Sequence, residues 1–316
     1  MENYEIIGNI GEGAHGVVLK ARCNYTLKMY ALKKVYVENI RKQFPIKVWR
    51  EINNLKKCNS PYVLKLSKWF CHRSSVVIVT DLMASDLKEV LSERRLNMAA
   101  VKRLMAMLLA GAAHLHCQKI MHRDLKPSNL LISFDGILKI ADFSLSCTFS
   151  EELEEKPQIF SHKVASRWYR APELLLGSQT YRTEVDLWSI GCIFVEMVNG
   201  APLFPGQSDV EQLGTVINFL GTPNFENFPL LSSLPDYSKV NFPSVKPCSF
   251  KNIVFRKTKG LIDLAKGFLK YNGAARITCD EALLHRYFFE SPEPCDPSKL
   301  LKLKRNHSGN KCILNK

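Results

Sequence analysis

The N-terminal quarter of the chain has the hydrophobic pattern of β-strands. YEIIGNIGEG, HGVVLKARC and YALKKVYV alternate apolar with polar residues or carry β-branched ones, with glycine at the first turn. SVVIVTDLM (75–83) is apolar almost throughout, which predicts a buried strand. Between them, PIKVWREINNLKKC (45–58) places Val48, Ile52 and Leu55 at helical spacing. We therefore expect a small β-rich unit that contains one helix.

The rest of the chain has mainly helical patterns. Two short strands are predicted at 130–132 and 138–142, with a turn at Asp135-Gly136 between them. No segment repeats another. The pattern predicts an α+β fold of two lobes, a small β-rich one and a larger helical one, with the break near Met83–Asp86. Helices are predicted at 86–94, 99–118, 184–199, 208–220, 260–270 and 280–285.

The composition is that of a globular protein. Hydrophobic residues make up 46% and charged residues 23% of the 316 positions, which excludes wholesale disorder. The longest apolar run, LMAMLLAGAA (104–113), is too short to span a bilayer, and MENYEIIGNI lacks the pattern of a signal peptide. Ten cysteines without a C-x-x-C pair predict reduced thiols rather than a zinc site. We expect no membrane partner.

The formal charge of +14 raises the question of a nucleic-acid partner. No predicted helix carries a basic stripe, and no aromatic residues alternate with the basic ones, so a solvated basic surface without specific nucleic-acid binding is expected. The tail KLLKLKRNHSGNKCILNK (299–316) has six basic and no acidic residues. Its composition predicts a disordered basic tail over 291–316, with docking to an acidic partner or nuclear import as alternatives.

A glycine-rich stretch, GEGAHGVV (11–18), supplies Gly11, Gly13 and Gly16. The same G-x-G-x-x-G spacing opens dinucleotide-binding βαβ units, but those need a helix directly after the glycines. Here another strand follows and leads to Lys33 in YALKKV. A hairpin that admits phosphate oxygens to backbone N–H groups, together with a lysine on a strand, is typical of a protein kinase. Taken alone, Lys33 could equally be a surface lysine.

A lysine that faces phosphates needs a partner to hold it. Glu51 in the 45–58 helix is the only acidic residue between Glu38 and Asp81. The alternative is a solvated surface glutamate. The absence of rival carboxylates favours the role of partner to Lys33.

The strongest single motif is HRDLKPSN (122–129). Asp124 is suited to accept a hydroxyl proton, Lys126 to neutralise charge on a moving phosphoryl group, and Asn129 to reach a magnesium ion. Asp142 follows in LKIADF and offers a carboxylate to the metal that bridges the phosphates. Together these residues predict phosphoryl transfer that uses ATP and Mg²⁺.

Further motifs carry a resemblance to eukaryotic Ser/Thr protein kinases over 4–289. WYRAPE (168–173), DLWSIGCIF (186–194) and Arg276 in AARIT complete it, and the resemblance implies the bilobal kinase fold and a buried Glu173–Arg276 ion pair. FPIKVWREI and PLFPGQSDVEQLGTVINFLGTPN are similar to the cyclin-dependent kinase group. GEGAHG, VASRWYRAPELL and ALLHRYFF are most similar to a divergent subfamily of that group, the cell cycle-related kinases. The lobes would be 1–83 and 84–290, followed by the 291–316 tail.

The resemblance also implies the binding roles. Adenine would lie between Ile10, Val18, Ala31 and Leu131, with Thr80 behind the pocket. Its hydrogen bonds would go to the backbone of Asp81 and Met83, in the hinge between the lobes. The carbonyl of Ala165 would turn toward Arg170, so that a substrate with proline after its Ser or Thr is preferred. The implied partners are such protein substrates and a cyclin-like subunit at the 45–58 helix. Cytoplasmic and nuclear residence is implied, with a ciliary or cell-cycle role left open. The expected ATP-binding residues are Ile10, Gly11, Glu12, Gly13, Ala14, His15, Gly16, Val17, Val18, Ala31, Lys33, Thr80, Asp81, Met83 and Leu131.

Several positions depart from the family pattern. Ser144 stands where the family has the glycine of Asp-Phe-Gly, and we expect it to cost roughly 1–2 kcal/mol if φ is positive there. The activating phosphate site would be Ser161, whose arginine cluster keeps Arg50 and Arg123 but has Cys147 at the third position. We therefore expect a weaker dependence on phosphorylation.

Two alternatives to a working protein kinase stay open. One is a kinase-shaped scaffold that docks partners without catalysis. The other is a kinase of small molecules or lipids, which WYRAPE and the 202–224 segment disfavour. The acidic segment EELEEK (151–156) is expected to be solvated, with a contact to Arg50 or Arg123 as an alternative.

Overall fold

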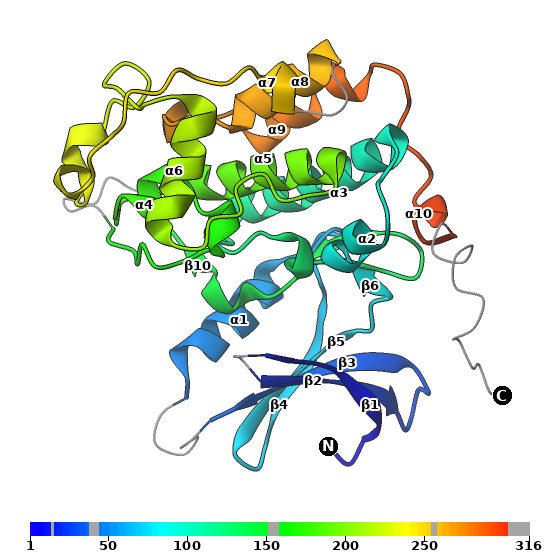
Figure 1. The fold of residues 1–316 in the computed structure, drawn as a ribbon. Coiled ribbons are helices and arrows are strands. Elements are labelled where there is room, and N and C mark those ends of the chain that lie inside the picture. The colour runs from blue at the N-terminus through cyan, green and yellow to red at the C-terminus, as the bar shows by residue number, and fades with distance from the viewer. Residues whose placement is uncertain (14–15, 38–43, 151–157, 254–257, 303–316) are drawn as a thin grey trace.

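The smaller lobe is a twisted antiparallel sheet with one helix beside it (Figure 1). The computed structural model describes residues 1–13, 16–37, 44–150, 158–253 and 258–302. The sheet has the order β1-β2-β3-β5-β4. Its helix is α1 (Ile46–Lys57). The strands are β1 (Tyr4–Gly13), β2 (Gly16–Cys23), β3 (Met29–Tyr36), β4 (Leu66–His72) and β5 (Ser75–Asp81).

Alternation along β5 explains why both faces of this sheet are covered. Val77 and Val79 point to one face, where they join a small cluster with Ala21 and Leu32. Val76 and Ile78 point to the other face and belong to the main core, which also contains the apolar side of α1. The apolar residues at every second position of β5 thus share one core with the apolar face of α1. This packing fixes α1 against β4 and β5.

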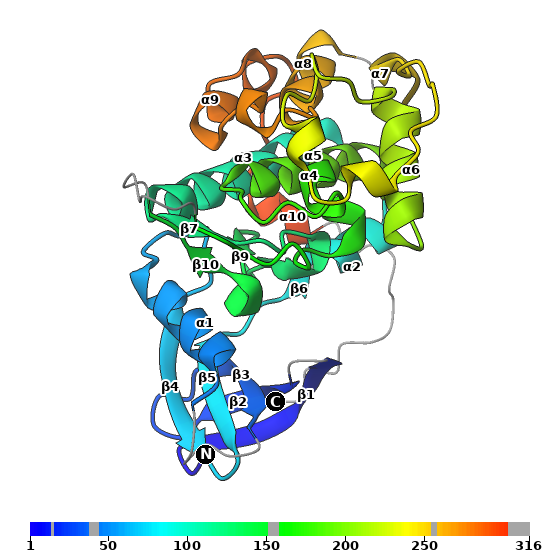
Figure 2. The same cartoon turned by 90° about the vertical axis from the view of Figure 1, so that its left-hand side faces the viewer.

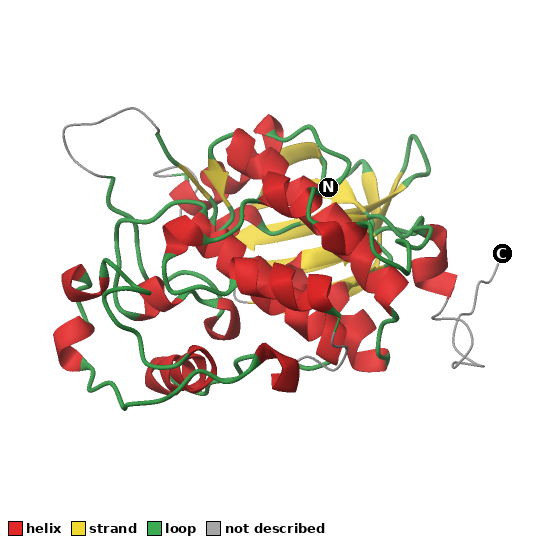
Figure 3. Ribbon diagram, turned by 90° about the horizontal axis from the view of Figure 1, so that it is seen from above, coloured by secondary structure: helices red, strands yellow, loops and turns green. Residues whose placement is uncertain are grey.

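The larger lobe is helical (Figures 1 and 2). Side-chain caps begin several of its helices: Asp86, Asn97, Ser208, Thr258 and Thr278 each accept a backbone N–H of the first turn. Between α6 and α7 the chain is mostly loop (Figure 3). The helices are α2 (Leu87–Glu93), α3 (Met98–Cys117), α4 (Pro172–Leu175), α5 (Glu184–Asn199), α6 (Asp209–Leu220), α7 (Phe250–Ile253), α8 (Lys259–Phe268), α9 (Cys279–Leu283) and α10 (Ser298–Lys302).

Short strands frame the segment that carries HRDLKPSN. β6 (Ser85–Asp86), β8 (Leu130–Ile132) and β9 (Leu138–Ile140) form one small sheet, and β7 (Ile120–Met121) pairs with β10 (Cys147–Thr148). The segment between β7 and β8 is therefore held at both ends. Because β10 follows β9 in the chain, the β7–β10 pair also brings the residues after β9 next to the segment that carries HRDLKPSN.

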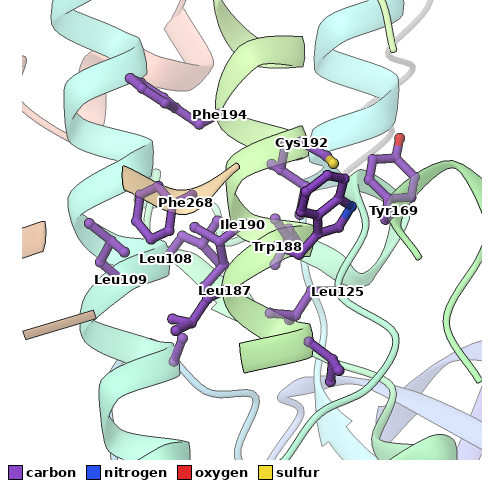
Figure 4. Packing of buried hydrophobic residues seen from close by; sticks show 14 of the residues in the cluster. Leu108, Leu109, Leu125, Tyr169, Leu187, Trp188, Ile190, Cys192, Phe194 and Phe268 are labelled. Carbon is purple, nitrogen blue, oxygen red and sulfur yellow. The ribbon is translucent and has the colours of Figure 1, made fainter. Parts of the chain in front are cut away.

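The centre of the core is α5, whose residues are buried from Val185 to Val198 (Figure 4). Trp188 is fully buried and stacks on Phe204, with ring centroids 5.8 Å apart. Gly191 lets α8 approach closely, because a Cβ there would lie 2.7 Å from the Cβ of Phe268. α5 thus holds α3 and α8 together.

Helix α3 also belongs to this core. By length and mean hydropathy (1.3) it meets the criteria for a membrane span, but 67% of that window is buried inside the protein. It is therefore a core helix, as its sequence predicts.

The end of the described chain differs from the expected 291–316 tail. Leu300 is buried, and Arg94 donates to its carbonyl oxygen at 2.8 Å. The backbone of Cys295 pairs with α3 through its N–H to Ala99 and its carbonyl to Arg103. The expectation was wrong for 291–300 because apolar side chains and backbone pairing, rather than charge, decide the placement there. Residues 303–316 lie outside the described residues.

Candidate active site

An ion chain joins the two lobes. Lys33 on β3 places its Nζ 2.7 Å from Oε1 of Glu51 and 2.8 Å from Oδ1 of Asp142. Glu51 is buried because the apolar side of α1 turns that face of the helix toward the sheet. Asp142 follows β9 after one intervening residue, Ala141. Lys33, Glu51 and Asp142 therefore meet as the sequence predicts.

The charges in this chain are strongly coupled. Burial opposes the ionisation of Asp142, but the charge and hydrogen bond of Lys33, with a hydrogen bond from the Ser144 side chain, outweigh it and lower the pKa of Asp142 to about 2. Burial also opposes the charge on Lys33, yet Glu51 and Asp142 raise its pKa above the usual value. Asp142 and Lys33 are therefore both ionised near neutral pH.

The segment between β7 and β8 presents Asp124. Its carboxylate accepts hydrogen bonds from Lys126 Nζ at 2.8 Å and from Asn129 Nδ2 at 3.1 Å. It also accepts from Ser166, through the backbone N–H at 2.8 Å and the hydroxyl at 2.9 Å. Four donor groups from three residues thus surround one buried carboxylate, which fixes its direction.

Asp186, in the first turn of α5, fixes the backbone of this segment through hydrogen bonds. It is fully buried and accepts the backbone N–H groups of His122 and Arg123, each at 2.8 Å. Arg123 has a φ of 64°, a left-handed conformation that non-glycine residues adopt only where other contacts hold it. The two bonds to Asp186 supply those contacts.

The glycine-rich hairpin lies above these groups. Gly13 pairs with Gly16, and Gly16 must be glycine because its φ is 124° and a Cβ would lie 2.0 Å from the carbonyl oxygen of Lys34. A cavity of 330 Å³ opens between the hairpin and α1, lined among others by Glu12, Val17 and Ser144. The expected contacts of Ala14 and His15 fall outside the described residues.

The expected adenine-binding residues lie on the strands around the hinge. Ala31 on β3 pairs with Thr80 on β5, and Thr80 is buried. Asp81 ends β5 and pairs with Lys28 at 2.9 Å. Ile10 is exposed beside Gly11, whose register partner is Val18. Met83 follows in the link between the lobes, and Leu131 lies on β8.

The residues expected to hold magnesium suit that ion. The amide nitrogen of Asn129 donates to the carbonyl oxygen of Asp124 at 2.8 Å, so its amide oxygen is the atom it can offer to a cation. The carboxylate of Asp142 is ionised. A carboxylate and an amide oxygen are ligands that Mg²⁺ prefers. In the described part of the chain, no three His, Cys, Asp or Glu side chains cluster as a metal site by themselves.

Ser144 differs from the expectation for its backbone. It lies in the 3-10 helix Phe143–Leu145 and is not among the described residues with positive φ. The left-handed residue of this turn is Asp142, with φ 61°. The expected strain at Ser144 is therefore absent in this conformation, because the turn is completed two residues earlier.

The segment before α4 has the backbone geometry that the resemblance implies at Ala165 and Arg170. Ala165 has a φ of 62°, and its carbonyl oxygen accepts from Arg170 Nη2 at 3.0 Å. Arg170 also donates to the carbonyl of Val164 at 2.9 Å. The strained backbone is thus fixed by one arginine. The orientation of the Ala165 carbonyl is confirmed.

The expected regulatory residues lie on different elements and differ in exposure. Ser161 is exposed, and so is Arg50 on α1. Arg123 is buried and donates to the Leu145 carbonyl at 2.8 Å and to Tyr181 Oη at 3.1 Å. Cys147 lies in β10. The acidic segment 151–156 lies outside the described residues, so its expected contact with arginines stays a prediction.

Two buried links complete the site. Arg276 and Glu173 form the expected ion pair, with contacts of 2.6 and 2.8 Å. The second link was not predicted: Asn54 on α1 donates to Ser146 Oγ at 2.8 Å. The positioning roles of Ser166, Asp186 and Tyr181 were missed as well. Of these, Ser166 and Asp186 lay in motifs that the sequence singled out, VASRWYRAPELL and DLWSIGCIF.

Comparisons with known proteins agree with this geometry. A family model described as "Protein kinase domain" matches residues 4–288. The chain is similar to cyclin-dependent kinase 20 from Danio rerio, with 48% identity over 303 residues, which cover 95% of this chain and 87% of that protein. The Homo sapiens protein of that name is 46% identical over the same coverage. A crystal structure of the yeast RNA Pol II CTD kinase CTDK-1 complex contains a similar chain, with a TM-score of 0.85, 32% identity, and coverage of 94% and 96%.

Proposed function

The chain belongs to the protein kinase family and is a cyclin-dependent kinase-like Ser/Thr protein kinase, and we propose that it transfers the γ-phosphate of ATP to Ser or Thr residues followed by proline. The observation that carries the catalytic part is the ion chain of Lys33, Glu51 and Asp142 beside the oriented carboxylate of Asp124. Kinases of this family generally use ATP and Mg²⁺.

Each group in the site has a task. Lys33, held by Glu51, would bind phosphate oxygens, and Asp124 would accept the proton of the substrate hydroxyl. Lys126 lies 2.8 Å from both Asp124 and Ser166 and would offset charge on the phosphoryl group. Mg²⁺, held by Asp142 and Asn129, would neutralise charge on the phosphates. Asn129 and Ser166 keep the Asp124 carboxylate in position throughout.

The preference for proline is supported by Ala165 and Arg170. Because Arg170 occupies the Ala165 carbonyl, an incoming backbone N–H at that point has no acceptor there. Leaving a backbone N–H without an acceptor costs roughly 1–3 kcal/mol of binding free energy, whereas proline has no N–H that needs an acceptor. We expect Ser-Pro peptides to react about tenfold or more faster than matched Ser-Ala peptides.

A cyclin-like subunit is proposed at α1. Ile46 and Trp49 are 62% and 46% exposed, and Trp49 lies against Phe44 and Trp69. An exposed apolar and aromatic patch on the helix that carries Glu51 supports a partner that sets the position of that helix. Residence in the cytoplasm and nucleus, with a ciliary or cell-cycle role, stays a prediction from the resemblance.

The test is magnesium-dependent phosphate transfer to a Ser-Pro peptide. Asp124→Asn is expected to lower kcat by roughly 10²–10⁴-fold, the usual contribution of a general base. The matched control is Asp135→Asn, which changes an exposed aspartate in the β8–β9 turn and is expected to be neutral. Equal rates for Ser-Pro and Ser-Ala peptides would reject the proline preference. A native chain that is silent with and without a cyclin-like subunit would favour the non-catalytic scaffold.

A further inference from the structure

Tyr181 contacts two segments: the one that carries Ser161, which we call the activation segment (residues 142–173), and the one between β7 and β8 that carries Asp124. Its hydroxyl donates to the carbonyl oxygen of Ser161 at 2.6 Å and accepts from Arg123 Nη1 at 3.1 Å. Tyr181 is only 4% exposed. One buried hydroxyl therefore joins the backbone at the expected phosphate site to the arginine directly before Asp124.

An aromatic contact reinforces this junction. The ring of Phe160 lies 5.4 Å from that of Tyr181, and the guanidinium of Arg123 lies 5.9 Å from the Phe160 centroid. The backbone N–H of Phe160 also donates to the carbonyl of Gln179 at 2.8 Å. Each of Phe160, Tyr181 and Arg123 thus contacts the other two, and we call this cluster the tyrosine anchor.

The anchor reaches the Asp-Phe-Ser turn as well. Arg123 donates to the carbonyl of Leu145 at 2.8 Å through its Nε. One side chain therefore binds both the turn after Asp142 and the segment that carries Ser161. In kinases controlled by phosphorylation, a phosphate performs this connection by pairing with arginines.

The chemistry of a tyrosine fits this place. A phenol hydroxyl can donate one hydrogen bond and accept another, which is the use made of it here. Burial raises the pKa of Tyr181 despite the nearby Arg123, so the hydroxyl keeps its proton. The buried surroundings strengthen both bonds.

The neighbouring residue secures a second part of the activation segment. Arg182 donates to the carbonyl of Ser150, and its guanidinium lies 5.6 Å from the ring of Phe149. Residues 179–182 thus contact the activation segment at two places, Phe149–Ser150 and Phe160–Ser161. Neither set of contacts involves a phosphate group.

We propose that Tyr181 is a positioning residue that takes over the role of Ser161 phosphorylation, so that the unphosphorylated chain already has its peptide-binding segment in place. This rests on the proposed function, since it concerns the same transfer. Cys147 stands at the third position of the arginine cluster, so one positive charge that would pair with a phosphate is missing. The uncharged Tyr181 hydroxyl makes the connection instead, through its hydrogen bonds to Ser161 and Arg123. Tyr181→Phe should make the enzyme dependent on phosphate at Ser161.

The experiment compares full-length proteins treated with phosphatase and checked by intact mass. Native protein is expected to lose less than about threefold of its kcat/KM for a Ser-Pro peptide on dephosphorylation. Dephosphorylated Tyr181→Phe should lose about tenfold, the effect of one hydrogen bond to a charged group, with the KM for ATP unchanged. Phosphorylation of Ser161 by a separate kinase should restore most of that loss. Tyr237→Phe, at a half-buried tyrosine of the larger lobe that stacks on Phe242, is the matched control and should be neutral.

Hydrogen exchange gives a readout that does not need activity. In Tyr181→Phe, peptides that cover 158–170 should exchange faster than in native protein, and the control should not differ. Loss of native activity on dephosphorylation would overturn the proposal, and so would a Tyr181→Phe variant that behaves like Tyr237→Phe. Faster exchange with unchanged transfer would reduce Tyr181 to a structural residue and reject the positioning role. A native chain without any transfer counts against the proposed function, and unchanged exchange would then still reject the anchor.

Discussion

Asn54 on α1 donates a hydrogen bond of 2.8 Å to the hydroxyl of Ser146, four residues after Asp142. Ser146 in turn donates to the carbonyl of Phe143 at 2.6 Å, and both Asn54 and Ser146 are buried. The helix that carries Glu51 is therefore joined directly to the turn that carries Asp142. This link and the Lys33 ion chain hold the same two elements together.

Removing one partner of this link should be worse than removing both. Ser146→Ala leaves the Asn54 amide buried without its acceptor, and we expect the free energy of unfolding to fall by about 1–3 kcal/mol. Asn54→Leu with Ser146→Ala replaces both polar groups by apolar ones and should recover most of that loss. Urea unfolding of the two single variants and the double variant measures the coupling. Additive losses would show that the two side chains do not interact.

The Glu173–Arg276 pair should be among the most sensitive sites for stability. The Arg276 side chain is 0% exposed, so Glu173→Gln leaves a buried guanidinium without its counter-charge. We expect the free energy of unfolding to fall by about 3–5 kcal/mol. Asp263→Asn, which affects an exposed pair with Arg286, is the control and should change it by less than about 1 kcal/mol. Similar losses from both variants would contradict the argument from burial.

Ser144→Gly is expected to give little or no gain in activity. Ser144 already has a backbone conformation that any residue adopts, so glycine relieves no strain. We expect kcat within about threefold of the native value (roughly 0.7 kcal/mol) in peptide phosphorylation assays. A gain of tenfold or more would mean that the working conformation requires a positive φ at this position, unlike the one described here.

Asp142 makes stability depend on pH in a predictable direction. Its pKa of about 2 in the folded chain lies below the ordinary value of 3.8, so its contribution is complete above about pH 5 and is lost as the pH falls toward 2. The full contribution is about 2 kcal/mol. The difference in free energy of unfolding between native protein and Asp142→Asn should shrink by about 1 kcal/mol from pH 6 to pH 3. Urea unfolding at several pH values measures it, and a constant difference would refute the assignment.

The parts of the molecule with a strong period could be predicted from the sequence. α1, α3 and α5 have long apolar patterns, and β5 is apolar along its length, so each was located within a residue or two. Lys33, Asp124, Asn129 and Asp142 could be predicted because each lies in a short motif whose chemistry needs that residue type. Glu51 could be predicted because no other carboxylate lies between Glu38 and Asp81.

Features made by distant residues could not be predicted in this way. β7 and β10 have two residues each, too few to show a period, and form only because they meet across the fold. Ser166 contacts Asp124 from 42 positions away, and Tyr181 contacts Arg123 from 58. A lone Ser or Tyr in the sequence gives no sign of such a contact. The strain expected at Ser144 was wrong because the backbone turn lies at Asp142.

The C-terminal segment sets a boundary that matters for anyone who shortens this protein. Lys102 on α3 is 2% exposed, lies over the ring of Tyr287 and donates to the carbonyl of Glu290. Truncation after the family match at residue 288 would strand that ammonium group in the interior and uncover the surface that Leu300 occupies. The unit that folds therefore extends past the unit that the family defines, and a shortened protein should retain at least residue 300.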